Sequence, residues 1–511
     1  MRRHAGGLAT GAALALVLLR SAAPLLFEGA FNSDQAVTGL MATHLVEGRA
    51  VPVFKYGQNY QLGVQAWLAA PLFALFGPSV FLLRLPLLLA NLALAALLVR
   101  LLRRETGLGA STALLAAVPF LLAPPVTSMQ FLEPSGGTIE PLLLAPVLWL
   151  LRRRPLAFGL VLAVGFLQRV FTIYALGALL ILELCDRSLW SRETGRRYLQ
   201  SGLVFAGVWQ IVMLVRDRAA SGFGPSTPVS TAALPMAART ASNVAEAVGR
   251  FCWDVALLPQ RVVALLGEHL AIMFGGRRMP VSDLVAEIPG DQGVDGLWLL
   301  AGTALGVALA RLTWLTVTGR VRPWLGRPRF GLFLFLTGVI SAGALVVSRC
   351  GPLETTTLRY TLHTVLGATG LAACYLAAEP ARWPRRGLAA VLCLWAVAST
   401  WSHGHLLATL ATDPPRDQNR LLAEYLVARD IRYGVADYWD AYATVFWAGE
   451  RVILASTTIE FITEYDLLVR RHPDEAVRIS REPCPGGTRA TERHWVCGPE
   501  PGAPAAGGGR R

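Results

Sequence analysis

The sequence predicts a polytopic α-helical membrane protein of about eleven transmembrane helices, followed by a small exported α/β domain. Its 511 residues are 54% hydrophobic and only 16% charged, whereas a soluble domain carries about 25% charged residues. Long apolar runs, such as residues 79–102 and 330–348, reach the roughly 20 residues with which a helix spans a bilayer. Because backbone polar groups cannot stay unpaired in hydrocarbon, helices are the expected form of these runs.

The arginines predict the orientation of these helices. Short cytoplasmic loops are rich in Lys and Arg, and arginine clusters occupy alternate loops here, from Arg2-Arg3 onward. The alternation places the N-terminus inside and the C-terminus outside. Between 155 and 185, two short spans or one longer helix with a re-entrant segment both fit the pattern. The expected spans lie near 8–27, 79–101, 108–124, 137–151, 155–168, 171–185, 199–215, 296–318, 330–348, 360–378 and 387–406.

Two other interpretations of the basic residues are not favoured. A net charge of +13 could indicate nucleic-acid binding, but the arginines cluster between apolar runs, where membrane topology accounts for them. Residues 4–27 could be a signal peptide, with a basic start and Ala22-Ala23. We favour an uncleaved anchor, because cleavage would detach the loop that follows. The expected location is the inner or plasma membrane, with no nucleic-acid partner.

The expected organisation has a membrane domain over residues 1–410, an exported domain over 411–499 and a disordered tail at 500–511. The membrane domain should present two large outer loops, at 28–78 and at 216–295. An amphipathic-looking piece lies at 255–274 in the second of these loops. The elements expected in the exported domain alternate as in a small α/β domain, with a helix at 419–431, a strand at 433–436, a helix at 438–448 and a strand at 451–455.

The seven cysteines show no metal-binding spacing. Cys484 and Cys497 fall in the expected exported domain, where oxidation can occur, so they either form a disulfide or remain two free thiols. His403 and His405 lie at the last outer boundary. They have no adjacent carboxylate cluster, so a metal site there is not favoured.

The first outer loop contains polar residues suited to chemistry. Asp34 follows the helix-capping residue Asn32, and apolar residues then recur at helical spacing as far as Gly48. The pattern predicts an amphipathic helix over 34–48, lying along the outer membrane surface, and a second one over 63–75. In the first turn, the helix dipole favours the ionised form of Asp34. This carboxylate is either reactive or only a helix cap.

Between the two expected helices lies a turn rich in Tyr, Gln and Asn. It contains Lys55, which is the only lysine of the chain. Lys55 is either a functional cation or an accident of a base composition that favours arginine codons. Tyr56, Gln58 and Tyr60 follow it. Together, the helices and the turn would form a roof over the membrane, suited to a substrate with a lipid tail and a polar head.

Further candidates lie at later outer boundaries. The pair Gly136-Gly137 permits a close backbone approach. Glu140 begins the next span, where an ionisable residue is costly unless it is solvated or partnered; it is a site residue or only a helix-start carboxylate. Arg169 and Arg359 lie at outer span ends. There, a guanidinium either pairs with phosphate or simply extends to the interface.

These motifs resemble those of the GT-C membrane glycosyltransferases. The similarity comprises an Asp in the first outer loop, a Tyr-Gly-Gln-x-Tyr-x-Gly-like stretch from residue 56, Arg-Leu-Pro at 84–86, Gly-Gly-x-x-Glu at 136–140 and the pair at 359–360. The chain is most similar to glycosyltransferase family 39, which includes protein O-mannosyltransferases and bacterial aminoarabinose transferases. Residues 436–442 are similar to the exported tails of bacterial members.

The resemblance implies transfer of a sugar from a polyprenyl-phosphate donor to an acceptor at the outer face. The acceptor would be an envelope lipid, a glycan or a protein. Asp34 matches the catalytic Asp of the family, and basic residues would hold the lipid phosphate. The substrate-binding candidates are Lys55, Tyr56, Gln58, Tyr60, Glu140, Arg169, Arg359 and Tyr360.

One departure from the family pattern concerns metal binding. The family often has Asp-Glu where this chain has Asp34-Gln35, which puts in doubt any role that needs the second carboxylate. No other cofactor is implied, and a divalent metal ion stays an open alternative. The other functions considered are a transporter or flippase of lipid-linked sugars and a non-catalytic envelope assembly protein. A transporter should show repeated halves and midplane charges, whereas this sequence has no visible repeat.

Overall fold

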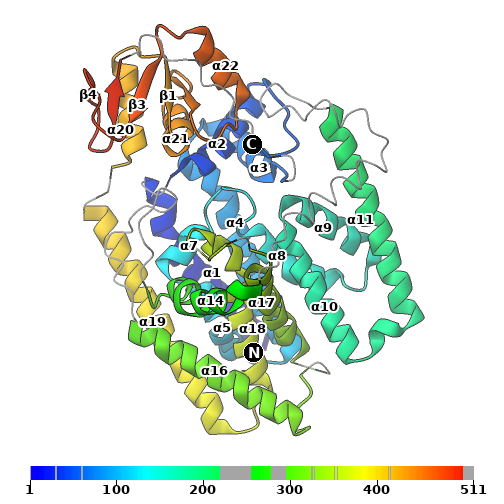
Figure 1. Cartoon of the computed structure of the whole chain (residues 1–511). Helices are drawn as coiled ribbons and strands as arrows, with labels where there is room; N and C mark the ends of the chain where they lie inside the picture. Colours follow the sequence, from blue (N-terminus) through cyan, green and yellow to red (C-terminus); the bar gives the residue numbers. More distant parts are fainter. Residues whose placement is uncertain are drawn as a thin grey trace.

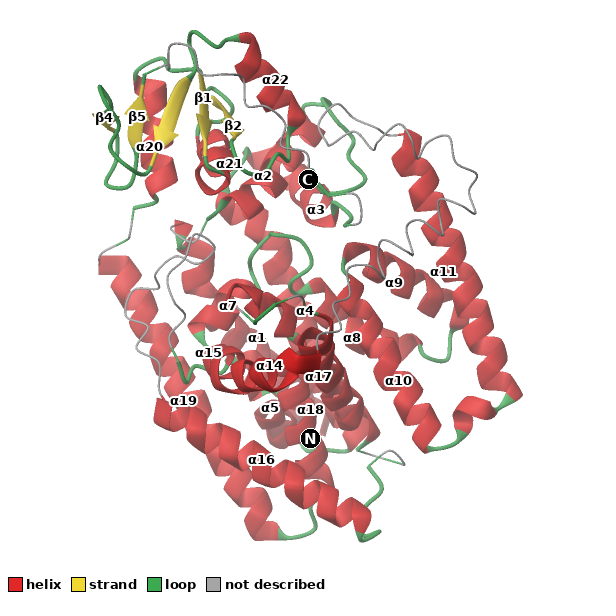
Figure 2. Ribbon diagram, in the orientation of Figure 1, coloured by secondary structure: helices red, strands yellow, loops and turns green. Residues whose placement is uncertain are grey.

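The computed structural model has a helical body with a small sheet domain at one end (Figure 1). Figure 2 shows the strands gathered in that domain, beside the helices α2 and α3. The structure describes residues 2–28, 31–58, 61–218, 255–277, 295–323, 326, 328–349, 351–353, 355–412, 414 and 416–498.

The body is built from helices, as the sequence predicts, and each expected span falls on one or more of them. Seven described helices are long and apolar enough to cross a membrane, so the chain is a multi-pass membrane protein, while the count of eleven stays a prediction. One of the seven, Val255–Met273, is the piece predicted within the long outer loop. The rest of that loop lies mostly outside the described residues. The helices are α1 (Arg2–Leu26), α2 (Ser33–Val46), α3 (Val64–Phe76), α4 (Val80–Thr106), α5 (Ala110–Ala116), α6 (Val118–Leu121), α7 (Pro125–Gln130), α8 (Glu140–Leu151), α9 (Pro155–Gln168), η2 (Val170–Thr172), α10 (Ile173–Cys185), η3 (Ser188–Trp190), α11 (Arg192–Arg218), η4 (Val255–Leu257), α14 (Leu258–Ala264), η5 (Leu265–His269), α15 (Leu270–Met273), α16 (Asp295–Val317), α17 (Arg329–Ser348), η6 (Thr355–Thr361), α18 (His363–Ala378) and α19 (Arg382–Thr412).

The region 155–185 contains two separate helices. α9 ends at Gln168, and Arg169 has an extended backbone (φ −161°, ψ 127°) before η2 and α10 begin. This arrangement agrees with two short spans better than with one longer helix. It also places Arg169 in a linker, where its side chain can reach neighbouring loops.

α2 differs from the amphipathic surface helix that the sequence predicted. Asn32 caps it as expected, because its Oδ1 accepts a hydrogen bond from the Gln35 amide at 3.2 Å. The helix is buried on nearly all sides, however, and even its polar residues Thr38 and His44 are buried. It packs against α3 and against α21 of the C-terminal domain. The expectation failed because the loop sequence gives no sign that a domain some 400 residues later covers its polar face.

The C-terminal domain confirms the predicted order of helix, strand, helix and strand. It also contains a helix and three strands that the sequence did not predict. Its five-stranded sheet has the order β2-β1-β3-β5-β4. β1 pairs in parallel with β2 and β3, while β5 pairs antiparallel with β3 and β4. The elements are α20 (Gln418–Ala428), β1 (Tyr433–Ala436), α21 (Tyr438–Trp447), β2 (Ile453–Ser456), α22 (Thr463–Arg471), β3 (Val477–Ser480), β4 (Thr488–Arg489) and β5 (Trp495–Cys497).

The first loop and the C-terminal domain share one hydrophobic core. Buried residues of α2 and α3, such as Leu40 and Phe73, belong to the same cluster as Phe446 of α21. The contact is close at Gly39, where a Cβ atom would lie 2.5 Å from the Phe446 ring. Burying one large apolar side chain contributes about 1.5–3 kcal/mol. The domain is therefore held against the loop by packing as well as by the polar contacts described below.

α17 and α18 form a closely packed pair that positions η6. A Cβ atom on Gly338 would lie 2.7 Å from the backbone of Gly367, so the two helices approach through small residues. Arg261 of α14 donates to the carbonyls of Val346 and Gly351 at 3.1 and 3.0 Å, at the end of α17. A cation at a helix C-terminus is favoured by the helix dipole. These contacts fix the backbone on both sides of η6.

Cys484 and Cys497 form a disulfide, which is one of the two alternatives that the sequence left open. Cys497 lies in β5, and the bridge closes a segment with a sequence separation of 13. A loop of this size lowers the entropy of the unfolded chain, which corresponds to about 3 kcal/mol of stability.

We predict that Cys484→Ser lowers the stability of the C-terminal domain by about 2–3 kcal/mol. Limited proteolysis over a temperature series, with and without reductant, measures this. The variant should be cleaved at a lower temperature than the wild type, and reductant should lower the wild-type value by a similar amount. The free, exposed Cys185 provides the control Cys185→Ser, which should behave as wild type. Equal resistance of Cys484→Ser and wild type would contradict the prediction.

Candidate active site

Asp34 lies in the first turn of α2, and its carboxylate receives hydrogen bonds from two distant parts of the chain. Arg359 of η6 donates to Oδ2 at 3.1 Å, and the hydroxyl of Tyr438 donates to Oδ1 at 2.5 Å. Its side chain is 14% exposed, so the carboxylate is largely withdrawn from solvent but still reachable. A buried carboxylate needs such partners, because an unpaired charge there is costly.

The surroundings of Asp34 favour its ionised form. Burial alone would raise the pKa of its carboxyl group. The positive charges of Lys55 and Arg359 and the hydrogen bonds from Tyr438 and Arg359 outweigh burial and hold the pKa below its ordinary value. Asp34 is therefore a carboxylate at neutral pH and can accept a proton.

Lys55 is buried beside Asp34 and connects the start of α2 to the loop that contains Ser135. Its ammonium group donates to the main-chain carbonyls of Asp34 and Ser135, at 3.0 and 2.8 Å. Burial lowers the pKa of Lys55 to about 8, although the charge of Asp34 works in the opposite direction. The single lysine of the chain is thus a cation near neutral pH, and its hydrogen bonds to Asp34 and Ser135 go to carbonyl oxygens.

Arg169 enters the same region from the linker between α9 and η2. It donates to Gln61 Oε1 at 2.7 Å, and its guanidinium lies 5.7 Å from the ring centroid of Tyr360. The predicted close approach at Gly136-Gly137 is confirmed. Both glycines have positive φ, and a Cβ on either would overlap Gln61 or Arg169.

Arg359 and Tyr360 follow each other in η6, at the start of the helical segment that continues as α18. The Arg359 guanidinium lies 5.6 Å from the Tyr360 ring centroid. Two guanidinium groups, those of Arg169 and Arg359, thus lie beside the same ring. The structure therefore brings together Asp34, Lys55, Arg169, Arg359 and Tyr360 from four segments of the chain.

The hydrogen bonds of the other predicted site residues, described next, go to residues other than Asp34. Glu140 accepts a hydrogen bond from Gln65 at 2.7 Å, and the other end of Gln65 accepts from the Gly136 amide at 2.7 Å. Tyr56 shares a hydrogen bond of 3.0 Å with His44, near the C-terminal domain. Gln58 closes the turn through its amide, 3.0 Å from the Lys55 carbonyl. Tyr60 lies outside the described residues.

Two residues of this region were missed as candidates. Glu133 is buried next to the cations, and burial raises its pKa although the charge of Arg359 opposes the shift. It stands in the same loop as Gly136, so its position beside that motif was the available signal. Tyr438 stands in the segment similar to bacterial tails, but no local pattern shows that its hydroxyl reaches Asp34.

Gln35, which stands where the resembled family often has Glu, makes a structural contact. Arg84 of α4 donates to Gln35 Oε1 at 3.1 Å and to the carbonyls of Pro24 and Phe27 at 2.7 and 2.8 Å. An amide oxygen accepts this bond without adding a second charge beside Asp34. Arg84 thereby joins the end of α1, the start of α2 and α4, and fixes the turn that carries Asp34.

The His-x-His motif at His403 and His405 lies on α19. Within the described ranges, no group of three or more His, Cys, Asp or Glu side chains gathers where it could hold a metal ion. His403, half of the His-x-His motif, lies with Nε2 2.7 Å from the Ala123 carbonyl, which joins α19 to the segment after α6. The residues around Asp34 are instead mostly cations and hydroxyl donors.

A polar cluster holds the C-terminal domain against α2. Glu450 lies 3.0 Å from His44 Nε2 and accepts a hydrogen bond from Arg49 at 2.7 Å. Tyr465 also donates to Glu450, at 2.7 Å. Closer to Asp34, the Ala443 amide of α21 donates to Ser33 Oγ at 3.2 Å. The start of α2 is thus bonded directly to α21.

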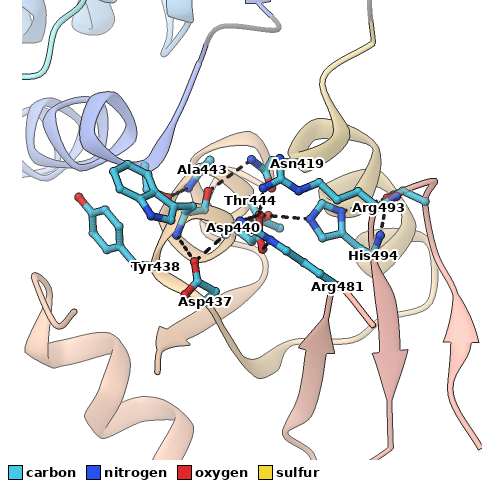
Figure 3. Close-up of polar contacts among 12 residues, drawn as sticks. Asn419, Asp437, Tyr438, Asp440, Ala443, Thr444, Arg481, Arg493 and His494 are labelled. Atoms are coloured by element: carbon cyan, nitrogen blue, oxygen red, sulfur yellow. Dashed lines mark hydrogen bonds and ion pairs between the residues drawn. The ribbon is translucent and has the colours of Figure 1, made fainter. Parts of the chain in front are cut away.

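Within the domain, α21 is anchored to the sheet by Asp440. Arg481 donates to both carboxylate oxygens at 2.8 and 3.0 Å, and His494 Nε2 lies 3.3 Å from Oδ1. Figure 3 shows the ring of Tyr438 pointing away from Arg481 and His494. Burial would raise the pKa of Asp440, but these partners lower it to about 2. The ion pairs hold one side of α21, while Tyr438 extends from another side toward α2.

Known structures share this fold. No protein-family model and no curated protein matches the sequence. Among solved structures, ArnT of Cupriavidus metallidurans bound to undecaprenyl phosphate has a TM-score of 0.57 at 13% identity, over 96% of this chain and 97% of its own. The apo state of that ArnT gives 0.54 at 12% identity, over 96% and 98%. The apo oligosaccharyltransferase of Archaeoglobus fulgidus gives 0.52 at 12% identity, over 93% of this chain and 69% of its own.

These similarities define the class of fold. ArnT, an aminoarabinose transferase, and the archaeal oligosaccharyltransferase are GT-C membrane glycosyltransferases. The chain has their fold over most of its length, as the resemblance in sequence motifs led us to expect. At 12–13% identity, the similarity shows the fold and leaves the activity to be argued from the site.

The interface cluster gives a prediction about acid stability. Burial would raise the pKa of Glu450, but hydrogen bonds from His44 and Arg49 lower it from 4.5 to about 2. Because the folded-state pKa is depressed, the contribution is complete above about pH 4.5 and is lost as the pH falls toward 2. Its size is about 3 kcal/mol. Glu450→Gln should remove this contribution at neutral pH. The free energy of unfolding of the variant should also change less with pH, above pH 2, than that of the wild type.

Thermal unfolding, monitored by limited proteolysis at pH values from 7 down to 3, measures the contribution of Glu450 to stability. The control is Glu424→Gln, which removes an exposed carboxylate of α20 that pairs with Arg420 within its own helix. That variant should match the wild type within about 0.5 kcal/mol. Identical stability of Glu450→Gln and wild type at pH 7 would show that the cluster does not hold the domain.

Proposed function

We propose that this protein transfers a sugar from a polyprenyl-phosphate donor to an acceptor hydroxyl, with Asp34 as the general base. One observation carries the proposal. An ionised carboxylate is held beside Lys55 and Arg359, which come from separate segments, in a chain with the fold of the GT-C glycosyltransferases. The carboxylate suits proton removal, and the cations suit a phosphate leaving group.

The cations account for the donor side of the reaction. Lys55, Arg169 and Arg359 surround one small region, and Tyr360 lies between the two guanidinium groups. A guanidinium fork binds phosphate oxygens well, and an ammonium group adds a compact charge. The raised pKa of Glu133 favours its neutral form, so it cancels less of this positive charge. ArnT, which has this fold, was solved with undecaprenyl phosphate, which supports a lipid phosphate as the donor carrier.

Asp34 accounts for the acceptor side. The acceptor hydroxyl gives its proton to the Asp34 carboxylate while its oxygen forms a bond with the anomeric carbon of the sugar. The bond between that carbon and the phosphate oxygen breaks, and the electron pair leaves with the polyprenyl phosphate. Lys55, Arg169 and Arg359 stabilise the charge that develops on the phosphate. A positioned base contributes typically about 10²–10⁴-fold to such a rate.

The position of these residues between membrane helices fits the proposed donor and acceptor roles. Asp34 and Lys55 belong to the segment between α1 and α4, two of the seven helices long and apolar enough to cross a membrane. A donor with a polyprenyl tail would stay in the bilayer while its head group reaches this segment. On the topology predicted from the arginines, the reaction occurs at the outer face, and the acceptor is an envelope lipid, glycan or protein.

The test is release of polyprenyl phosphate by the purified full-length protein in nanodiscs. Wild type and Asp34→Asn are incubated with a panel of polyprenyl-phosphate sugars and with cell-envelope extract as acceptor. The wild type should turn over at least one donor, and Asp34→Asn should be slower by about 10²-fold or more, because asparagine cannot accept the proton. The control Asp430→Asn changes an exposed carboxylate of the C-terminal domain and should keep the wild-type rate.

Each outcome bears on the proposal. Turnover by wild type and Asp430→Asn, but not by Asp34→Asn, supports transfer with Asp34 as the base. Equal turnover by all three proteins would move the base away from α2. Absence of turnover with every donor would contradict the proposed activity and would favour a transport or assembly role, which a donor-flipping assay with the protein in sealed vesicles then tests.

A further inference from the structure

Tyr438 is the only residue of the described C-terminal domain that an observed hydrogen bond joins to Asp34. The two residues are 404 positions apart in the sequence. Tyr438 is 1% exposed, and its hydroxyl donates to Asp34 Oδ1 at 2.5 Å. Hydrogen bonds in which the acceptor is ionised are short and about twice as strong as neutral ones. This contact is therefore a substantial restraint on the carboxylate.

The side chain of Tyr438 is held in one orientation by its neighbours. Its ring contacts those of Trp439, Tyr442 and Phe461, with centroids 4.8, 5.6 and 5.2 Å away. Asp437 caps α21 by accepting from the Trp439 amide at 3.0 Å. A ring enclosed in this way cannot turn away from Asp34 without disturbing the packing around it.

The helix that carries Tyr438 is itself fixed on two sides. Asp440 anchors α21 to the sheet through Arg481 and His494, and the Ala443 amide bonds to Ser33 at the start of α2. The shared hydrophobic core, including Phe446 against Gly39, adds apolar packing to the side that faces α2. The position of the Tyr438 hydroxyl is therefore determined by the docked domain as a whole.

We infer that Tyr438 is a positioning residue of the reaction centre and that the C-terminal domain is a built-in part of that centre. The inference rests on the proposed function. Tyr438 holds Oδ1 and Arg359 holds Oδ2, so the plane of the Asp34 carboxylate is fixed from both sides. An ionised carboxylate has about four lone-pair sites, so each oxygen retains one with which to receive the acceptor proton. Holding a base in a productive orientation lowers the entropic part of the barrier.

The test is a comparison of kinetic parameters and pH profiles for wild type and Tyr438→Phe. Phenylalanine keeps the enclosed ring but cannot hold Oδ1. We expect kcat to fall by about 10- to 100-fold, in line with the loss of a hydrogen bond to a charged group, with the donor KM nearly unchanged. The acid limb of the pH–rate profile should move to higher pH, because the Tyr438 hydrogen bond helps to keep the Asp34 pKa low.

The matched control is Tyr442→Phe, four residues later in the same helix and equally buried at 1%. Its hydroxyl accepts from the amides of Phe461 and Ile462 at 2.7 and 3.2 Å and does not touch Asp34. Loss of this hydroxyl also weakens the domain, but the acid limb should stay at the wild-type pH. A shift of the limb in both variants would indicate a general structural effect and would overturn the inference.

A second variant tests the inference in case Tyr438→Phe folds poorly. 3-Fluorotyrosine at position 438 retains the ring and the hydroxyl and is a stronger donor, so it should move the acid limb to lower pH. A wild-type kcat and pH profile in both the Tyr438→Phe and fluorotyrosine proteins would overturn the inference, while Asp34→Asn still reports on the proposed function. A faster Tyr438→Phe would also overturn it, since the hydroxyl would then obstruct the acceptor.

Discussion

The carboxylate of Asp34, which is largely withdrawn from solvent, is the constraint on which the rest of the arrangement depends. A charge withdrawn from water costs several kcal/mol unless hydrogen bonds and opposite charges replace the lost solvent. Here the replacements come from η6, from α21 and from the turn that contains Lys55. None of these segments shares a helix or a hairpin with Asp34. The carboxylate therefore has all of its partners only when the membrane helices and the C-terminal domain are both in place. The site and the tertiary structure therefore depend on each other.

This dependence explains why the first loop and the C-terminal domain behave as one unit. Small residues of α2 let α21 approach closely, as at Gly39, and the polar cluster around Glu450 adds directional contacts. Within the domain, the disulfide and the ion pairs of Asp440 fix the sheet and α21. A domain needed only to bind a distant partner would not require this degree of contact with the loop that contains Asp34.

The sequence was sufficient for the features that depend on local physics. Apolar runs predicted the membrane helices, the alternation of helical and strand segments predicted the small α/β domain with β1 and β2, and Asn32 predicted the start of α2, because each is determined by neighbouring residues. Motifs also named Asp34, Lys55, Arg169, Arg359 and Tyr360, which the structure brings together. What could not be predicted is the contact of Tyr438 with Asp34 and the burial of α2. Both depend on a domain whose position is set by packing across some 400 residues, for which a single sequence contains no local signal.

The central claim is that the cations hold a lipid phosphate while Asp34 acts as a base and not as a phosphate ligand. The most direct measurement is the affinity of the purified full-length protein in nanodiscs for undecaprenyl phosphate, compared between wild type and Asp34→Asn. We predict that Asp34→Asn binds at least as tightly as the wild type, because removal of its negative charge leaves Lys55 and Arg359 less neutralised. Loss of binding by Asp34→Asn would contradict the role of Asp34 as a base alone, because the carboxylate would then be needed to assemble the phosphate site itself.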